Sequence, residues 1–295
     1  MNKKTNWFGK RLEYKLKEVR FLLIDDYDYK DRKFRKDFSA IPNLNNPTRF
    51  NEKVIYRMLY DNNEMFGQLA DKVNARKHVA EVAGEEYLVP LIGVYNTFDD
   101  INFSTFPKRF VIKCSHDSGS YIICHDISEF CFHEAKRKIN FFLSRNMYIV
   151  TREKHYRDIE PKIICEAYID VFRNRDRDIT PELYRFHCFN GEPRYIEADF
   201  TDSQGKEYVN VYNMDWQKQV VTVNYPVLPK AIAPPDMLPE MVALSRKLSA
   251  EFDYCRIDLF LAGDKIYFNE FTFTPGAGRI KFKPASFDYL LGSLW

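Results

Sequence analysis

Two carboxylates near the C-terminal end of the chain are the residues best suited to chemistry. Segment 254–279 has two apolar, β-rich runs on either side of a turn signal at 262–264, a pattern that predicts a β-hairpin. Asp258 lies on the first arm and Glu270 on the second. Because side chains alternate between the two faces of a strand, a loop with an odd number of residues places both acids on one face.

Arg256 and Thr272 share that expected face with the two acids. Carboxylate and hydroxyl oxygens are ligands that Mg²⁺ prefers, and an arginine beside them can offset the charge of a phosphoryl group. The cluster is therefore typical of a magnesium–phosphate site. From the spacing alone, an ordinary hairpin with solvent-facing charges is an equal alternative.

Lys113 is a second candidate, because it stands inside a β-branched strand predicted over 109–115. An ammonium group is unusual in such a strand unless it meets an anion. The polar loop 115–120 follows, and backbone N–H groups and hydroxyls in such a loop can cover phosphates. A lysine on an edge strand beside a polar turn is the plainer alternative.

Two further polar residues interrupt apolar strand patterns. Glu166 lies in the strand predicted over 162–170 and could accept hydrogen bonds from a ribose or a base edge. Arg185 shares one face of the strand predicted over 183–189 with His187, and its planar guanidinium could pair with phosphate oxygens. Solvent exposure of Glu166 and a packing role for His187 are the alternatives.

The elements that must position these residues alternate between helices and antiparallel hairpins, which indicates an α+β or mixed α/β class. Helices are predicted over 7–23, 51–60, 69–83, 132–145 and 237–251. Strands are predicted over 91–95, 109–115, 120–125, 162–170, 183–189, 193–200 and 208–224. Residues 24–38 are predicted to be a charged connector, and 226–239 a proline-rich one.

The composition of the chain further limits the kind of protein it can be. A chain of 295 residues can form two or three subdomains, and 16% aromatic residues favour a well-packed protein over a disordered one. A net charge of +2 is too small for a general nucleic-acid role. The six cysteines lack zinc-ligand spacing, and most fall in predicted strands, so we expect reduced, buried thiols in a cytoplasmic protein.

The helix predicted over 7–23 is amphipathic, with an apolar stripe and a basic opposite face. We expect its stripe to pack on the body of the protein. Contact with an anionic membrane surface or a partner is the alternative. Its charges exclude a signal peptide, and no stretch of the sequence is long and apolar enough to span a bilayer.

Several common motifs are absent from the sequence. It contains no Gly-x-Ser-x-Gly nucleophile elbow, and no cysteine carries a local sign of an activated thiolate. It also contains neither a Walker A motif nor Gly-x-Gly-x-x-Gly. A nucleotide site would therefore need another architecture.

Taken in order, the motifs resemble the TupA-like branch of the ATP-grasp superfamily, from about Asn46 to the C-terminal Leu-Leu-Gly-Ser-Leu. The residues that carry the resemblance are Lys72 with Ala75-Arg76, Lys113 with His116 and Ser118-Gly119, Glu166, Arg185, Arg256 with Asp258, and Glu270 with Thr272 and Pro275-Gly276. The resemblance implies an ATP-grasp fold, in which two α+β subdomains hold ATP between antiparallel sheets. It implies an N-terminal region over 1–70, a first subdomain over 71–165 and a second over 166–295.

The resemblance also implies cofactors and roles. ATP and Mg²⁺ are the expected cofactors. Phosphate contacts are implied for Lys72, Lys113, Arg185 and the loop residues Ser115, His116, Ser118, Gly119 and Ser120. The adenine and ribose hinge is implied for Glu166, Ala167 and Tyr168. Asp258, Glu270 and Thr272 would ligate the metal, with Thr272 where many relatives carry asparagine. Arg256, Arg185 and Lys113 would offset charge on the transferring phosphoryl group.

The implied activity is ATP-dependent ligation of a carboxylate to an amine through an acyl phosphate. The implied setting is bacterial cell-surface polysaccharide synthesis (capsule, O-antigen or teichuronopeptide), with a uronic acid or other acidic group as substrate. Asp117, Ser120 and Tyr121 depart from the family's glycine-rich loop, and Asp117 adds negative charge near the phosphates. A glycosyltransferase, a kinase and a non-catalytic nucleotide-binding protein are the alternatives. The sequence does not indicate the oligomeric state.

Overall fold

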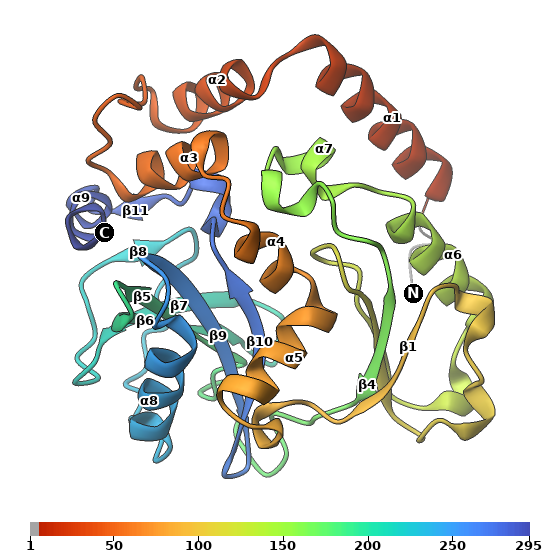
Figure 1. Cartoon of the computed structure of the whole chain (residues 1–295). Helices are drawn as coiled ribbons and strands as arrows, with labels where there is room; N and C mark the ends of the chain where they lie inside the picture. The colour runs from red at the N-terminus through yellow and green to blue at the C-terminus, as the bar shows by residue number, and fades with distance from the viewer. Residues whose placement is uncertain (1–5) are drawn as a thin grey trace.

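Two antiparallel β-sheets form the centre of the molecule, described over residues 6–295 by a computed structural model (Figure 1). The first sheet has the order β1-β4-β2-β3 and the second the order β10-β9-β5-β6-β7. The strands of the first are β1 (Leu91–Tyr95), β2 (Phe110–Cys114), β3 (Ile122–Cys124) and β4 (Ile163–Ala167). Those of the second are β5 (Leu183–Phe189), β6 (Glu192–Thr201), β7 (Glu207–Asn213), β9 (Tyr254–Ala262) and β10 (Lys265–Thr272). Strands β8 (Thr222–Val223) and β11 (Phe282–Lys283) pair separately.

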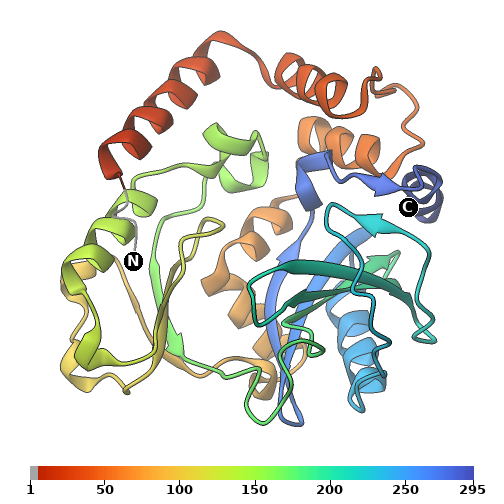
Figure 2. The ribbon, with the colours of Figure 1, turned by 180° about the vertical axis from the view of Figure 1, so that it is seen from behind.

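Helices surround these sheets and cross above them. They are α1 (Trp7–Leu23), α2 (Asp26–Phe38), α3 (Phe50–Tyr60), α4 (Glu64–Ala70), α5 (Lys72–Val82), α6 (Phe132–Leu143), α7 (Met147–Thr151), α8 (Leu238–Ser249) and α9 (Ser286–Leu294). Seen from behind, the two sheets stand side by side beneath an arch made by α1 and α2 (Figure 2). The α+β class is confirmed.

Alternation along each central strand decides which side chains reach the space between the sheets. On β5, Tyr184, Phe186 and Cys188 enter the core that α4, α5 and α8 cover, so Arg185 and His187 point to the other face. Burying side chains of this size stabilises the fold by about 1.5–3 kcal/mol each. The buried face thereby fixes the orientation of the polar face.

The first sheet follows the same rule. Phe110, Ile112 and Cys114 of β2 lie in a buried cluster with Ile139 of α6, so Lys113 projects from the opposite face. Strand β4 runs to Ala167, two residues past the boundary expected between the subdomains.

Residues 24–38, predicted to be a connector, are helical from Asp26 and form α2, so that prediction is wrong. Asp25 caps the helix, and Arg35 pairs with Asp31 one turn away at 2.6 Å. Phe34 is buried and anchors the helix. Local charge pairs and one buried ring thus stabilise a helix in a segment of mainly polar composition.

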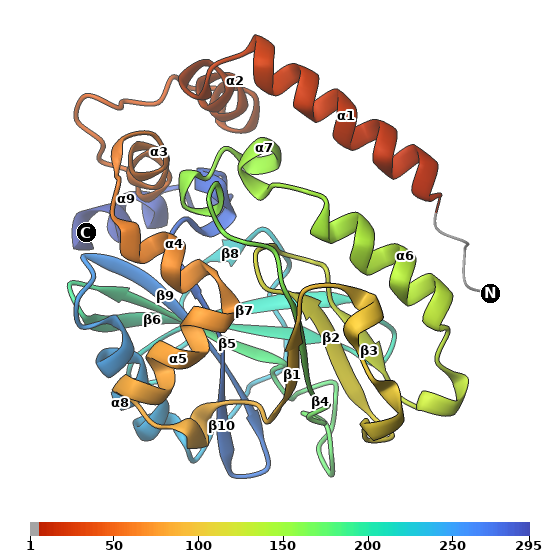
Figure 3. The same ribbon diagram turned by 45° about the vertical axis from the view of Figure 1, so that its right-hand side comes forward.

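The arch joins the two halves of the molecule (Figure 3). At one end Trp7 of α1 donates to Glu134 of α6 at 3.2 Å. In the middle Arg152, just after α7, pairs with Asp26 at 2.7 Å. At the other end Asp37 of α2 contacts Arg279 at 3.4 Å. Residues 7–37 therefore bridge helix α6 beside the first sheet and the C-terminal part of the chain.

Helix α1 occupies the predicted range, but its stripe is oriented differently from the prediction. Trp7 and Tyr14 are the buried residues, whereas the predicted stripe faces solvent, with Phe8 79% exposed. Within residues 6–295, no helix has the length and apolarity needed to cross a membrane. The cysteine prediction is confirmed for five of the six, which are free and buried, and Cys131 is exposed.

Candidate nucleotide and metal site

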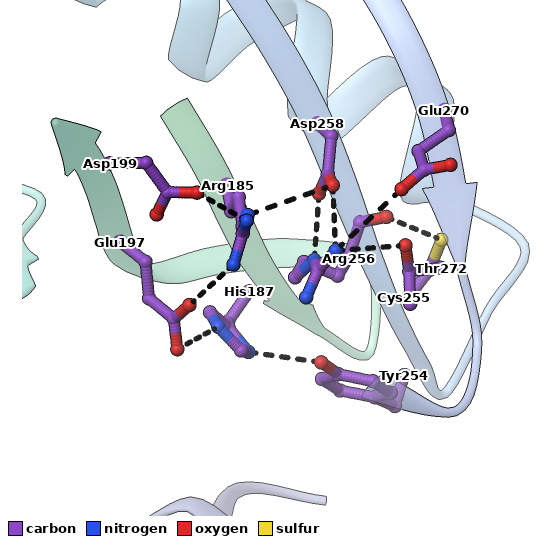
Figure 4. Close-up of polar contacts among 10 residues, drawn as sticks. All are labelled: Arg185, His187, Glu197, Asp199, Tyr254, Cys255, Arg256, Asp258, Glu270 and Thr272. Atoms are coloured by element: carbon purple, nitrogen blue, oxygen red, sulfur yellow. Dashed lines mark hydrogen bonds and ion pairs between the residues drawn. The ribbon is translucent and has the colours of Figure 1, made fainter. Parts of the chain in front are cut away.

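A row of charged side chains crosses four strands of the second sheet (Figure 4). Glu197 of β6 lies opposite Arg185 of β5, Arg185 opposite Asp258 of β9, and Asp258 opposite Glu270 of β10. Residues directly opposite each other in antiparallel strands share a face. The predicted hairpin and the common face of its two acids are therefore confirmed.

The reason for that common face differs from the predicted odd-numbered loop. Ala262 pairs with Lys265 across a two-residue turn, which by itself would place Glu270 on the other face. The register shifts between Phe268 and Glu270, where Asn269 forms a β-bulge. This one extra residue returns Glu270 to the face of Asp258.

Arg256 lies between the acids. It donates to both carboxylate oxygens of Asp258, at 2.7 and 2.6 Å, and to Oγ1 of Thr272 at 3.1 Å. Glu270 lies 3.9 Å from the same guanidinium. Burial raises the pKa of the Asp258 carboxyl, and Arg256 opposes this rise. The arginine thus compensates a carboxylate that has no exposed surface.

Arg185 is the second cation of this face. It pairs with Asp199, lies 3.6 Å from Glu197 and reaches Asp258 at 4.0 Å. Burial raises the pKa of Asp199 to about 7, although Arg185 opposes the rise. One oxygen of Asp199, Oδ1, has no hydrogen-bond partner. This carboxyl can therefore exchange a proton near neutral pH.

His187 has structural partners rather than a free catalytic position. Its Nδ1 shares a hydrogen bond of 2.9 Å with the Tyr254 hydroxyl, and Nε2 lies 3.2 Å from Glu197. Burial alone would raise the pKa of Glu197, but the His187 contact and the nearby arginines lower it to about 2. Glu197 therefore remains ionised beside the ring.

The donor set suits a magnesium ion bound together with phosphates. Within residues 6–295 no group of three or more His, Cys, Asp or Glu side chains is arranged to hold a metal. Mg²⁺ is commonly held by only one or two carboxylates, with substrate phosphates and water completing its shell. Glu270, with a 38% exposed side chain, offers its oxygens directly, while those of Asp258 are shared with Arg256.

A cavity of about 440 Å³ opens beside Glu270, between the two sheets. Lys113 enters it from β2 and pairs with Oε2 of Glu166 at 2.6 Å. Arg76 of α5 takes the other oxygen at 2.8 Å. The predicted site residues that line the cavity are Lys72, Lys113, Ser118, Gly119, Ser120, Glu166, Ala167, Tyr168 and Glu270.

Glu166 is thus neither solvent-facing nor free. Both its oxygens are engaged, so in this state it positions Lys113, and the ribose contact expected for it stays a prediction. Arg76 belongs to one of the motifs that carry the family resemblance, but the resemblance implies no role for it. Its partner lies 90 positions away in the sequence, so no local pattern reveals the pair.

The polar loop after β2 divides into residues that face the cavity and residues that hold its shape. Ser115 and His116 are buried, and His116 contacts the Arg145 carbonyl at 3.1 Å. Ser120 Oγ accepts from the Cys114 N–H at 2.9 Å while the residue lines the cavity. At the loop's start, Lys72 donates to the backbone carbonyl of Asp117 at 2.5 Å.

Asp117 is among the residues that line the cavity, but its carboxylate is enclosed by the protein. Its side chain has no exposed surface and lies 3.4 Å from the Arg145 guanidinium. Burial raises the pKa of this carboxyl. The loop therefore tolerates an acid because that acid is buried against a cation.

The family model for TupA-like ATPgrasp proteins matches residues 52–295. The chain belongs to the TupA-like ATP-grasp family. Its two antiparallel sheets with the cavity between them are accordingly the ATP-grasp fold. No curated protein matches the sequence. The arch helices α1 and α2 lie outside the matched segment.

Solved structures similar to this TupA-like chain include three ATP-grasp or ligase structures. An L-amino acid ligase from Bacillus licheniformis is 15% identical, with a TM-score of 0.47. The match covers 87% of the present chain and 57% of the ligase chain. A D-alanine–D-alanine ligase from Bacillus anthracis, complexed with ATP, is 16% identical, with a TM-score of 0.39. The match covers 71% of the present chain and 55% of the ligase chain. A RimK domain ATP-grasp protein from Sphaerobacter thermophilus is 11% identical, with a TM-score of 0.41. The match covers 84% of the present chain and 70% of the other chain. The chain thus spans little more than half the length of the first two.

Proposed function

We propose that this TupA-like protein is an ATP-dependent ligase that joins a carboxylate to an amine through an acyl phosphate. The observation that supports it most is the juxtaposition of two features. A face carrying Arg185, Arg256, Asp258 and Glu270 adjoins a cavity that Lys72 and Lys113 enter. Cations and metal-binding acids at one place are what phosphoryl transfer requires.

Each of these side chains would interact with the negative charge of the ATP phosphates or with the bound metal ion. Lys72 and Lys113 would bind the ATP phosphates, with Glu166 and Arg76 holding Lys113 in position. Asp258, Glu270 and Thr272 would hold Mg²⁺, which when bound neutralises charge on phosphoryl oxygens. This assignment requires Arg256 to release at least one Asp258 oxygen, after which its guanidinium is free to face the transferring group.

The proposed reaction has two steps. An oxygen of the substrate carboxylate attacks the γ-phosphorus, and the bond to ADP breaks. The amine nitrogen then attacks the acyl carbon, inorganic phosphate leaves, and the nitrogen loses a proton. Arg185 and Arg256 would offset the charge that builds up on the phosphoryl oxygens in the first step. The amide product contains no atom of ATP.

For the substrate, we propose a uronic acid or another acidic group of a bacterial cell-surface polysaccharide, modified in the cytoplasm. This assignment depends on the family resemblance. The direct test is ADP release with Mg²⁺ and a panel of uronic acids and amines. Release that needs both partners supports the ligase, and release with a hydroxyl acceptor alone indicates a kinase. Consumption of a nucleotide-sugar instead of ATP indicates a glycosyltransferase, and ATP binding without turnover a non-catalytic protein.

We also propose that the outward face of α1 rests on an anionic membrane surface. Its exposed apolar residues are Phe8, Leu12, Leu16, Val19, Leu22 and Leu23. Exposed Lys10, Arg11 and Lys15 flank this stripe, and amphipathic helices of this kind lie in the interface of anionic bilayers.

Vesicle flotation tests this membrane contact. Anionic vesicles should carry the protein and neutral ones should not, and Leu12→Ser with Leu16→Ser should abolish flotation. Ile41→Ser, which removes an exposed apolar side chain elsewhere, is the matched control. Equal flotation with neutral vesicles, or of the double variant, would contradict the proposal.

A further inference from the structure

A second cavity, of about 240 Å³, lies beneath the arch, between α1, α2, α3, the end of α7 and the loop after β10. Its lining contains five cationic residues and no acidic one. They are Lys17 and Arg20 of α1, Lys30 and Lys33 of α2, and Arg279. Such an excess is unusual, because like charges brought together in a partly buried space repel one another.

Nearby acids neutralise only two of the five cations. Lys17 pairs with Glu13 at 2.6 Å and Arg279 with Asp37 at 3.4 Å. The adjacent Asp26 is engaged by Arg152 at 2.7 Å. Within residues 6–295, Arg20, Lys30 and Lys33 have no carboxylate within 4.0 Å. Three basic side chains of this cavity are therefore without an ionic partner.

The more buried of these basic side chains lack a full set of hydrogen-bond or ionic partners. Lys30 is 2% exposed and donates to the Thr151 carbonyl at 2.8 Å and towards the Met58 sulfur at 3.2 Å. Arg20 stacks on the Tyr29 ring at 4.9 Å, and its buried Nε has no hydrogen-bond partner. Burial lowers the pKa of Lys30 to about 7, although Glu153 and Asp26 oppose this. An anion in the cavity would supply the missing partner.

A short stretch of chain connects the cavity to the proposed metal site. Ala277, which lines it, follows Thr272 by five residues, so the two Cα atoms are at most roughly 18 Å apart. Four of the five cations come from the arch, which precedes the segment matched by the family. Most of the cavity's basic side chains thus lie outside the segment that the family model matches.

We infer that this cavity binds a phosphoryl group, phosphate or pyrophosphate, carried by the acceptor substrate at a distance from its reacting group. The Lys33 ammonium group and the Arg20 guanidinium fork, with Lys30 as a further donor that a bound anion would keep protonated, suit the multiple charges and oxygens of a phosphoryl group better than the two oxygens of a carboxylate. The volume is below that of a whole-ligand site, which suits one anionic group. The inference rests on the proposed ligase function for the identity of the molecule that carries the group.

The test is calorimetric titration of the full chain with inorganic phosphate and with pyrophosphate. A non-hydrolysable ATP analogue and Mg²⁺ are added first, so that the nucleotide cavity is filled and its occupancy is measured separately. Arg20→Gln and Lys33→Gln remove unpaired cations from the cavity. Lys36→Gln, on the exposed surface of the same α2, is the matched control. Far-UV circular dichroism checks that each variant is folded.

Pyrophosphate should bind the wild type with a millimolar or lower dissociation constant, and each cavity variant should weaken binding about tenfold. The control should bind like the wild type. The inference is overturned if the wild type takes up neither anion at about 10 mM, or if Lys33→Gln binds as tightly as Lys36→Gln. Nucleotide binding without anion binding would refute this inference alone. Anion binding that responds to Lys33→Gln without nucleotide binding would refute only the ligase.

Discussion

Neutralising Asp258 and Glu270 one at a time should separate stability from activity, because the two acids differ in burial. Asp258 has no exposed surface, and both its oxygens accept from Arg256 at 2.7 and 2.6 Å. The Glu270 side chain is 38% exposed and touches the same guanidinium only at 3.9 Å. We therefore compare Asp258→Asn with Glu270→Gln.

The expected changes in unfolding free energy follow from these contacts. Asp258→Asn leaves the Arg256 guanidinium buried without its counter-charge, a loss of about 3–5 kcal/mol for a broken buried pair. Glu270→Gln removes a long, partly exposed contact worth about 1 kcal/mol or less. Both should lower kcat for ADP release at least about 100-fold, because each removes charge from the expected metal site.

Guanidinium unfolding followed by circular dichroism gives the stability of each variant. ADP release across a Mg²⁺ titration gives its activity. Asp264→Asn, an exposed acid in the turn of the same hairpin, serves as the control and should change neither quantity. Glu270→Gln with normal turnover would refute the metal assignment. A loss of stability in Glu270→Gln as large as that in Asp258→Asn would refute the argument from burial.

Three further predictions test other parts of the structure. The folded-state pKa of Lys30, lowered by burial to about 7, lies below its unfolded value, so the wild type should gain stability from pH 7 to 9 by up to about 1.4 kcal/mol per unit. Denaturant unfolding of Lys30→Met should lack this gain, and an unchanged pH slope would contradict the burial of a charge. In native protein a thiol reagent should modify Cys131 alone, and fast reaction of a second thiol would contradict the described burial. Gly292→Ala places a Cβ 2.1 Å from the Thr48 carbonyl oxygen and should lower stability by about 1–3 kcal/mol, whereas an unchanged unfolding midpoint would contradict this packing.

The sequence predicted the elements with strong periodicity. Helix α1 has the predicted bounds, and the hairpin around Gly263 carries Asp258 and Glu270 on one face. What it did not reveal is the bulge at Asn269 that produces this face. A bulge is a choice of backbone register, and a single asparagine in an apolar strand carries no signal for it.

The sequence also did not predict which face of helix α1 packs on the protein. The stripe at Phe8, Leu12 and Leu16 shows that α1 is amphipathic, but a second apolar set that includes Trp7 and Tyr14 packs on the protein instead. Periodicity identifies apolar faces without saying which of them meets the core.

Tertiary partners account for the remaining gaps at the site. Glu166 could be identified as a polar residue in an apolar strand, yet its partners Lys113 and Arg76 come from β2 and α5. The Asp117–Arg145 contact likewise joins a loop to the connection between α6 and α7. Such pairs depend on how elements pack, which a single sequence does not encode locally.

In the proposed reaction a substrate carboxylate is activated by phosphoryl transfer, and isotope transfer tests this step most directly. A panel of uronic and amino acids, exchanged to ¹⁸O at their carboxyl groups, is incubated with the protein, ATP, Mg²⁺ and an amine. Mass spectrometry of the inorganic phosphate then follows the label. The proposed reaction places one carboxyl oxygen in each phosphate released. ADP formation with unlabelled phosphate would contradict an acyl phosphate and, with it, the ligase proposed for this site.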